Sequence, residues 1–393
     1  MRKIYFDHNA TTPVHPEVRK AVEPYLSEQF GNPSSIHWAG RDVRKGVEDA
    51  RQEIAAFFGC QPLEVVFASS GTESDNLAIK GVAFRKGNAG KHIITSQVEH
   101  PAVMNACRSL EDQGFRVTYV PVDRHGIVDP ESVRKALTPE TILITVMYAN
   151  NETGSVMPIP EIGAIAREAG VIMHTDAVQA AGKIPIDLRS LPVDMLTFSG
   201  HKVNALKGSG GLIVRRGIEF EPLTHGGHQE RGRRGGTENV VGIIAMGKSF
   251  QLLRNGMEEE IAEIRRLRDK FDQGLFARIP ELVRNGHPTL RLPNTVNISF
   301  RYVEGEAMLL NLDMMGIASS SGSACTSGSL EPSPILMAMG ADPTDAQGAL
   351  RFSLGLGNTD SDVEYAIDAI ETVVHKLRAL SPLYPSAKEA KAR

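Results

Sequence analysis

Short runs of β-branched and apolar residues alternate with amphipathic segments between about residues 64 and 215, and this alternation constrains the fold more than any other feature of the chain. It predicts an α/β protein with a mostly parallel, doubly wound sheet. Ligands of such sheets bind beyond the carboxyl ends of the strands, so functional residues are expected directly after each strand. The strands are predicted at 64–68, 92–95, 116–120, 141–147, 171–174 and 194–198, and crossover helices at 73–84, 101–113 and 159–169.

A long helical pattern over residues 240–278 separates this block from a second one. Glu and Arg recur in it at spacings of three and four residues, as on the exposed face of a helix. We predict a large domain over residues 14–255 and a smaller α+β domain formed by residues 1–13 and 256–393. In the second block, strands are predicted at 295–300, 317–319 and 350–353, and helices at 304–314 and 360–380.

The composition excludes several classes of protein. With 393 residues, 41% of them hydrophobic, the chain can fill the cores of about two or three domains and is not disordered. Its 43 Lys and Arg against 47 Asp and Glu give a net charge of −4, which argues against nucleic-acid binding. Uncharged apolar stretches fall well short of the roughly 20 residues that span a membrane, and no apolar signal segment is visible. We therefore expect a cytoplasmic protein that binds a small soluble ligand.

The three cysteines, Cys60, Cys107 and Cys325, form no C-x-x-C pair, which argues against a disulfide framework and against a permanent metal site. Cys60 and Cys107 lie in apolar helical surroundings and are predicted to be structural. Cys325 lies in a run of Ser, Gly, Ala and Thr from residue 319 to 329, which can pack no core. We expect its thiol to be exposed, mobile and free to act as a nucleophile.

Two segments have the composition of a phosphate-binding loop. Residues 69–73 follow a strand and open a helix, and Gly71 and Thr72 could place a phosphate on free N–H groups, although an ordinary helix cap explains the segment equally well. Residues 242–249 match the pattern G-x-x-x-x-G-K-S. They continue an apolar helical pattern with no strand before it, so we predict no nucleotide site there.

The ends of two later strands supply an acid, an amide and a lysine. Asp176 and Gln179 follow one strand, and Ser199, His201 and Lys202 follow the next. This is the equipment that pyridoxal 5'-phosphate (PLP) requires. The acid would keep the pyridine nitrogen protonated, the amide would donate to the phenolate oxygen, and the lysine would form a Schiff base with the aldehyde. Each residue alone has a structural explanation as a cap or surface group, but together such explanations are improbable.

Three further residues are candidates for the same crevice. His100 follows the strand at 92–95 and could stack on a cofactor ring and relay protons, although a loop histidine without function is the alternative. Asn151 also follows a strand, but asparagine is common in turns. Arg351 has apolar neighbours and could bind a substrate carboxylate with both arms of its guanidinium. The glycine-rich residues 225–237 are expected to reach a phosphate or a second subunit.

The chain resembles the NifS/IscS-type cysteine desulfurases, which are fold-type I PLP enzymes of the class V aminotransferases. The resemblance runs nearly end to end, and residues 226–234 and 236–239 are closer to the NifS branch. One departure is Leu206, where the family usually has proline. The motifs that carry the resemblance are Asp7-His-Asn-Ala-Thr-Thr12, Phe30-Gly-Asn-Pro-Ser-Ser35, Gly71-Thr-Glu-Ser-Asp-Asn76, Glu99-His100, Asn150-Asn-Glu152, Ser199-Gly-His-Lys202 and Ser320-Ser-Gly-Ser-Ala-Cys-Thr326.

The resemblance implies a role for each candidate residue. Lys202 would bind PLP covalently, Asp176 and Gln179 would contact the ring nitrogen and the phenolate oxygen, and His100 would lie over the ring. Asn151 and Arg351 would hold the substrate carboxylate, and Asn151 would also reach the cofactor. The phosphate would be bound by Gly71, Thr72, Ser199 and His201, together with Thr237 of a second subunit in a homodimer.

The activity implied is the conversion of L-cysteine to L-alanine, with the sulfur held as a persulfide on Cys325. An iron-sulfur scaffold protein would accept the sulfur, and Cys325 could transiently touch a nascent cluster. Two alternatives remain open at this stage: another PLP-dependent reaction such as selenocysteine lysis or transamination, and a scaffold homologue without catalysis.

Overall fold

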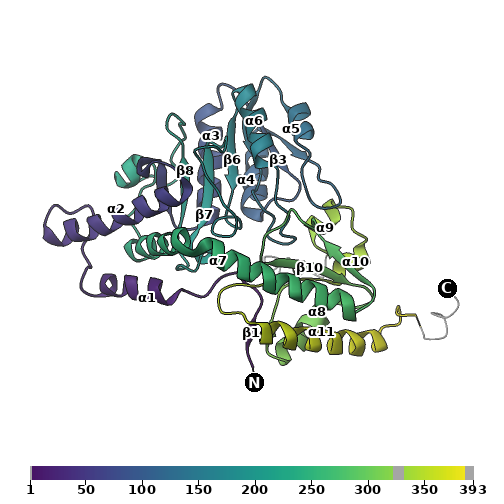
Figure 1. Cartoon of the computed structure of the whole chain (residues 1–393). Coiled ribbons are helices and arrows are strands. Elements are labelled where there is room, and N and C mark those ends of the chain that lie inside the picture. Colours follow the sequence, from purple (N-terminus) through teal and green to yellow (C-terminus); the bar gives the residue numbers. More distant parts are fainter. Residues whose placement is uncertain (1, 322–331, 386–393) are drawn as a thin grey trace.

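The computed structural model describes residues 2–321 and 332–385 (Figure 1). Its main feature is a seven-stranded sheet with the strand order β2-β8-β7-β6-β5-β3-β4. Strands β3 to β7 run parallel to one another, whereas β8 is antiparallel to both β2 and β7. The predicted mostly parallel sheet is therefore confirmed. The strands are β2 (Val65–Ala68), β3 (His92–Ser96), β4 (Arg116–Val120), β5 (Thr141–Thr145), β6 (Ile172–Asp176), β7 (Met195–Ser199) and β8 (Gly210–Val214).

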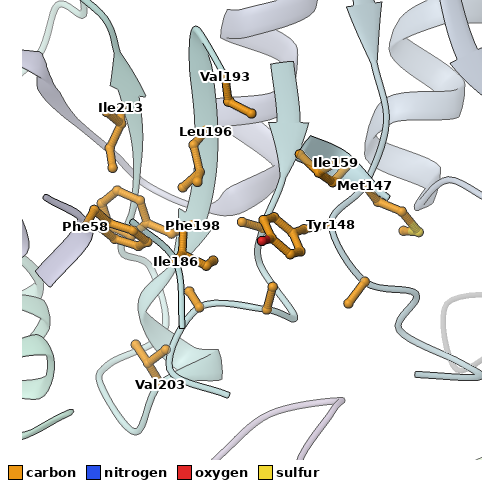
Figure 2. Close-up of a cluster of buried hydrophobic side chains, with 14 of the residues drawn as sticks. Phe58, Met147, Tyr148, Ile159, Ile186, Val193, Leu196, Phe198, Val203 and Ile213 are labelled. Atoms are coloured by element: carbon orange, nitrogen blue, oxygen red, sulfur yellow. The ribbon is translucent and has the colours of Figure 1, made fainter. Parts of the chain in front are cut away.

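Helices cover both faces of this sheet, because alternate residues of each strand point to opposite sides. In β2, Val65 and Phe67 join one apolar cluster, and Val66 joins the other. The first cluster includes side chains of α2 (Trp38–Phe58), α6 (Ile159–Ala169) and α7 (Val240–Arg278), and the second those of α3 (Gly71–Lys86) and α4 (Pro101–Glu111). Figure 2 shows part of the first cluster, where Phe58 and Phe198 lie side by side.

A second unit is built around smaller sheets. Strands β9 (Leu282–Asn285), β10 (Thr295–Phe300) and β12 (Ala349–Ser353) form an antiparallel sheet in the order β12-β10-β9. The amino-terminal β1 (Ile4–Tyr5) pairs in parallel with β11 (Ile317–Ala318). The remaining helices are α1 (Pro16–Val22), α5 (Pro130–Ala136), α8 (Gly305–Met314), α9 (Pro334–Ala338), α10 (Pro343–Gln347) and α11 (Asp360–Leu380).

Helix α7 connects the two units. It begins beside α2 at the large sheet and ends beside β10 and α11 (Figure 1). Its later residues Leu267, Phe271 and Leu275 pack with Ile4 and Phe6 in a core separate from that of the large sheet. The division into residues 14–255 on one side and 1–13 with 256–393 on the other remains a proposal, and this core supports it. Residues 242–249 lie inside α7, as predicted.

None of the helices in the described ranges combines the length and the apolar character that a membrane crossing would need.

Candidate active site

A pocket of about 320 Å³ lies at the carboxyl ends of β5, β6 and β7. Its walls bring together side chains that are far apart in the sequence. Every site residue predicted from the sequence lines it except Thr237 and Cys325. Those that line it are Gly71, Thr72, His100, Asn151, Asp176, Gln179, Ser199, His201, Lys202 and Arg351.

Thr237 lies in a neighbouring hollow that also contains Ser69 and Arg234. It therefore does not line the pocket of its own chain. Cys325 lies outside the described residues, so its predicted exposure and mobility stay predictions.

Lys202 follows β7 in the short 3₁₀ turn Gly200–Lys202. Its Nζ donates hydrogen bonds to the backbone carbonyls of Asn9 (2.6 Å) and Ala10 (2.7 Å). The amino-terminal segment thus forms one wall of the pocket and holds the amine inside it. The sequence reveals no such role for residues 9 and 10, because the contact spans about half of the chain.

Asp176 is the last residue of β6 and is buried. Its Oδ1 accepts a hydrogen bond from the backbone N–H of Val178 at 2.9 Å. Burial raises the pKa of the carboxyl group, while the nearby His100 and Lys202 oppose this shift. A carboxylate held in such surroundings needs a cationic partner, which a protonated ring nitrogen would provide.

His100 caps the amino terminus of α4 with its side chain. Its Nδ1 accepts a hydrogen bond from the backbone N–H of Ala102 at 3.1 Å, which leaves Nε2 as the position for the ring proton. Burial lowers the pKa of His100; Asp176 opposes the shift and Lys202 adds to it. The neutral imidazole therefore lines the pocket with a donor at Nε2.

The start of α3 has the geometry of an anion site. Gly71 and Thr72 are its first residues, and the Ser70 side chain caps it by accepting from the N–H of Glu73 at 3.1 Å. A Cβ on Gly71 would lie 2.7 Å from Val178 Cγ2, so only glycine fits this close approach without a shift. Free N–H groups at a helix start and the hydroxyls of Thr72 and Ser199 are the donors that a phosphate needs.

Arg351 lies on β12 and is almost completely buried. Its guanidinium forms an ion pair with Asp7 (Nη2 to Oδ1, 2.7 Å) and donates to the backbone carbonyl of Asn151 at 3.0 Å. Within the described residues, the buried Nε of Arg351 and Oδ1 of Asn151 have no hydrogen-bond partner. Unsatisfied buried polar atoms that line a pocket indicate a polar ligand.

Three ionisable residues near the pocket were missed by the sequence analysis, two of them buried and one, Lys183, half-buried. Glu99 accepts from the Ser96 hydroxyl at 2.5 Å, and burial raises its pKa to about 8. Asp75 lies 3.7 Å from His174 Nε2, and burial and Asp176 raise its pKa. Lys183 is the third. The sequence predicts burial only for the apolar strand runs. These three residues lie in a helix or in turns, where no residue spacing marks them as buried.

A scan against protein-family models matches the class-V aminotransferase family over residues 4–366. The chain belongs to this family. Among curated relatives, the cysteine desulfurase of Trichormus azollae is 53% identical over 97% of this chain and 95% of its own length. The cysteine desulfurase IscS of Dictyoglomus turgidum is 50% identical over 97% of both chains. The resemblance found in the sequence is thereby confirmed.

Solved structures agree with this assignment. A NifS-like protein has a TM-score of 0.90 and 36% identity over 95% of this chain and 100% of its own. The NifS-like protein from Rickettsia africae has a TM-score of 0.86 at 30% identity over 95% of this chain.

As a member of the class-V aminotransferase family, the protein uses PLP as its cofactor. The pocket fits it, because it holds an anion site at α3, a buried carboxylate, a lysine amine and unsatisfied polar atoms within one cavity. No cluster of ligands that could hold a metal ion occurs in residues 2–321 and 332–385.

Proposed function

We propose that the protein is a PLP-dependent cysteine desulfurase that converts L-cysteine to L-alanine and passes the sulfur to an acceptor. The observation that carries this function is the convergence of Lys202, Asp176, His100 and Arg351 in one pocket. Curated relatives named cysteine desulfurase match nearly the whole chain and support the same conclusion.

The cofactor, when bound, acts as an electron sink for the charge that remains when an amino acid loses its Cα proton. Lys202 would hold the cofactor through its Nζ and, once released from it, would accept the Cα proton. Asp176 keeps the ring nitrogen protonated by its negative charge. Gln179 would donate to the phenolate oxygen. His100, with its proton at Nε2, would lie at the ring, and either it or Lys202 would return a proton to the product.

Two residues orient the substrate. Arg351 binds the cysteine carboxylate through its guanidinium, and Asn151 contributes its side-chain amide. The hydrogen bond from Arg351 to the Asn151 carbonyl holds these two groups in register. Gly71, Thr72, Ser199 and His201 bind the phosphate end and so fix the cofactor relative to Lys202.

Cys325 is the proposed sulfur acceptor. Its thiolate attacks the substrate sulfur, so a sulfur–sulfur bond forms while the substrate carbon–sulfur bond breaks and its electron pair stays with the carbon skeleton, which is protonated to alanine. On one side of Cys325, Ser320 pairs with the backbone of Arg351; on the other, the Ser333 hydroxyl donates to Glu152 at 2.6 Å. Four residues beyond Ser321 can extend about 14 Å at most, which supports access of Cys325 to the pocket.

The same proposal includes a homodimer and an acceptor. Thr237 would bind the phosphate in the pocket of the other subunit, as its place outside its own pocket suggests. Leu26, Phe30, Ile36 and Trp38 are exposed large apolar side chains, and such surfaces are typical of subunit interfaces. We propose that iron-sulfur scaffold proteins accept the sulfur and that Cys325 transiently binds a nascent cluster. The protein would have a NifS-like role and would be located in the cytoplasm.

Replacing the proposed sulfur acceptor tests this function. Cys325→Ser should retain the visible spectrum of bound PLP but lower alanine formation from L-cysteine at least about 100-fold, because no thiolate remains to accept the sulfur. Cys60→Ser is the control: burial raises the pKa of Cys60 to about 12, so its thiol is unreactive and alanine formation should not change. Full alanine production by Cys325→Ser would contradict the desulfurase function and favour another PLP-dependent reaction.

A further inference from the structure

Lys183 lies in the turn after β6, and no role follows for it from the proposed function. Its Nζ donates two hydrogen bonds to one residue, Gln179: one to the backbone carbonyl and one to the side-chain Oε1, each 3.1 Å long. The ion pairs found among the described residues include none with Lys183. The lysine is thus directed at the pocket residue Gln179 rather than at a carboxylate.

These contacts fix the orientation of the Gln179 amide. The protonated Lys183 Nζ can only donate, so in that form the atom that it contacts must be the amide oxygen. On the other side, Gln179 Nε2 is 3.0 Å from the backbone carbonyl of Asn9, which can only accept. The two contacts agree, and a flipped amide would break both of them. The second Nε2 hydrogen therefore stays available for a group in the pocket.

The orientation is coupled to the catalytic lysine. The Asn9 carbonyl accepts from Gln179 Nε2 and also from Lys202 Nζ, at 2.6 Å. The Asn9 side chain is itself held by Thr295 and Asn294 at 2.9 and 3.0 Å. Gln179 and Lys202 thus share the Asn9 carbonyl as an acceptor, and Lys183 is connected to it only through Gln179.

The surroundings of Lys183 are rich in positive charge. Lys202 and Arg351 act on it from the pocket, and its own charge acts on His8 and His201. The pKa of Lys183 is lowered to about 7, mainly by burial and to a smaller extent by the charges of Lys202 and Arg351. A neutral amine still carries hydrogens and can keep donating to Oε1 after Lys183 loses its proton, while the Asn9 carbonyl, which can only accept, keeps Nε2 on its own side.

We propose that Lys183 is a positioning residue that holds the Gln179 amide with its N–H groups toward Asn9 and the cofactor pocket. Without Lys183 the amide can rotate and present its oxygen to the phenolate oxygen of the cofactor, where two acceptors would repel one another. This inference rests on the proposed role of Gln179 at the phenolate oxygen.

The test uses purified holoenzyme and follows the visible absorbance of the lysine-bound cofactor as a function of pH. Loss of a hydrogen bond to the phenolate makes the cofactor more basic, so Lys183→Met should raise the midpoint of this titration by about one pH unit, a tenfold change. Lys248→Met is the matched control. Lys248 also donates to a glutamine Oε1, that of Gln251 at 2.9 Å, but it does so in α7 and should leave the midpoint unchanged.

A double-mutant cycle separates positioning from a simple effect of charge. If Lys183 acts through Gln179, Lys183→Met should shift the midpoint by less than half as much in the Gln179→Ala background as in the native protein. Equal shifts in both backgrounds, or no shift with Lys183→Met alone, would overturn the inference. If Lys183→Met does not fold, Lys183→Arg, which keeps the donors, should hold the native midpoint, and a one-unit rise there would equally overturn it. No shift with Gln179→Ala would instead refute the proposed role of Gln179.

Discussion

The two walls of the pocket differ in their chemistry. The wall contributed by the large sheet carries Asp176, Asp75 and His100, and Glu99, the residue before His100, is buried nearby. Burial raises the pKa of each acid and lowers that of the histidine. The opposite wall comes from the amino-terminal segment and β12. It carries the Arg351 guanidinium and the backbone carbonyls that receive Lys202.

This difference suggests a division of work. Buried acids with raised pKa values and a histidine kept neutral suit proton transfer, so the sheet wall would hold and move protons around the cofactor ring. A guanidinium stays charged at every relevant pH and suits binding of an anion. The opposite wall would therefore orient the substrate. Variants of each wall should consequently change different kinetic constants.

The largest effect is expected at Asp176. Asp176→Asn removes the negative charge proposed to keep the ring nitrogen protonated, and kcat should fall about 100- to 1000-fold, while KM changes little. Asp194→Asn is a suitable control, because Asp194 accepts from the backbone of Met173 at the other end of β6, away from the pocket. Steady-state kinetics would distinguish the two, and an equal loss in both variants would indicate damage to the sheet instead.

The second effect concerns the opposite wall. Arg351→Ala should raise KM for L-cysteine about 100-fold, since truncating one partner of a buried charged pair costs about 2–5 kcal/mol. The change in kcat should be smaller than that of Asp176→Asn. Arg351→Lys keeps the charge but loses the two-armed geometry and should give an intermediate KM. An unchanged KM in Arg351→Ala would remove Arg351 from substrate binding.

The smallest effect is on the stability of the protein, and it tests whether Glu99, next to the sheet wall, is protonated in the folded state. Burial raises the pKa of Glu99 to about 8. At pH values between the ordinary pKa of a free Glu and about 8, the folded protein therefore keeps a proton on Glu99 that the unfolded chain has lost. Its contribution to stability therefore falls as the pH rises from about 4.5 to 8, by up to about 1.4 kcal/mol per unit. Glu99→Gln, which is neutral at every pH, should gain stability relative to the native protein between pH 5.5 and 7.5.

Denaturant unfolding at these two pH values measures the Glu99 effect. The difference in unfolding free energy between Glu99→Gln and the native protein should grow by about 1–3 kcal/mol across the interval. A difference independent of pH would show that Glu99 is ionised in the folded protein.

Much of the fold could be predicted because its signals are local. Helix α7 and strand β10 have the bounds expected from the sequence, since amphipathic spacing and β-branched runs are read within a few residues. Helix α2 was not predicted, although it packs along α7. Strand β8 was not predicted either, and its antiparallel direction depends on contacts with β2 and β7, which lie far from it in the sequence or in a separate strand run.

The candidate site was predicted where a residue follows a strand, as Asp176 and Lys202 do. Asp7 and Asn9 contact Arg351 and Lys202 across more than 190 positions, and such contacts leave no spacing to recognise in a single sequence. Lys183 was missed for a different reason. Its proposed role is to orient the side-chain amide of Gln179, and the orientation of a side chain cannot be deduced from the sequence.

The central claim is that Lys202 carries the cofactor at the carboxyl end of β7. Reduction of the purified holoenzyme with borohydride, followed by proteolysis and peptide mass mapping, tests it directly. A pyridoxyl adduct on Lys202, and none on Lys183, is the result that these contacts predict. An adduct on another lysine, or a protein that traps no pyridoxyl group, would contradict the assignment of this pocket.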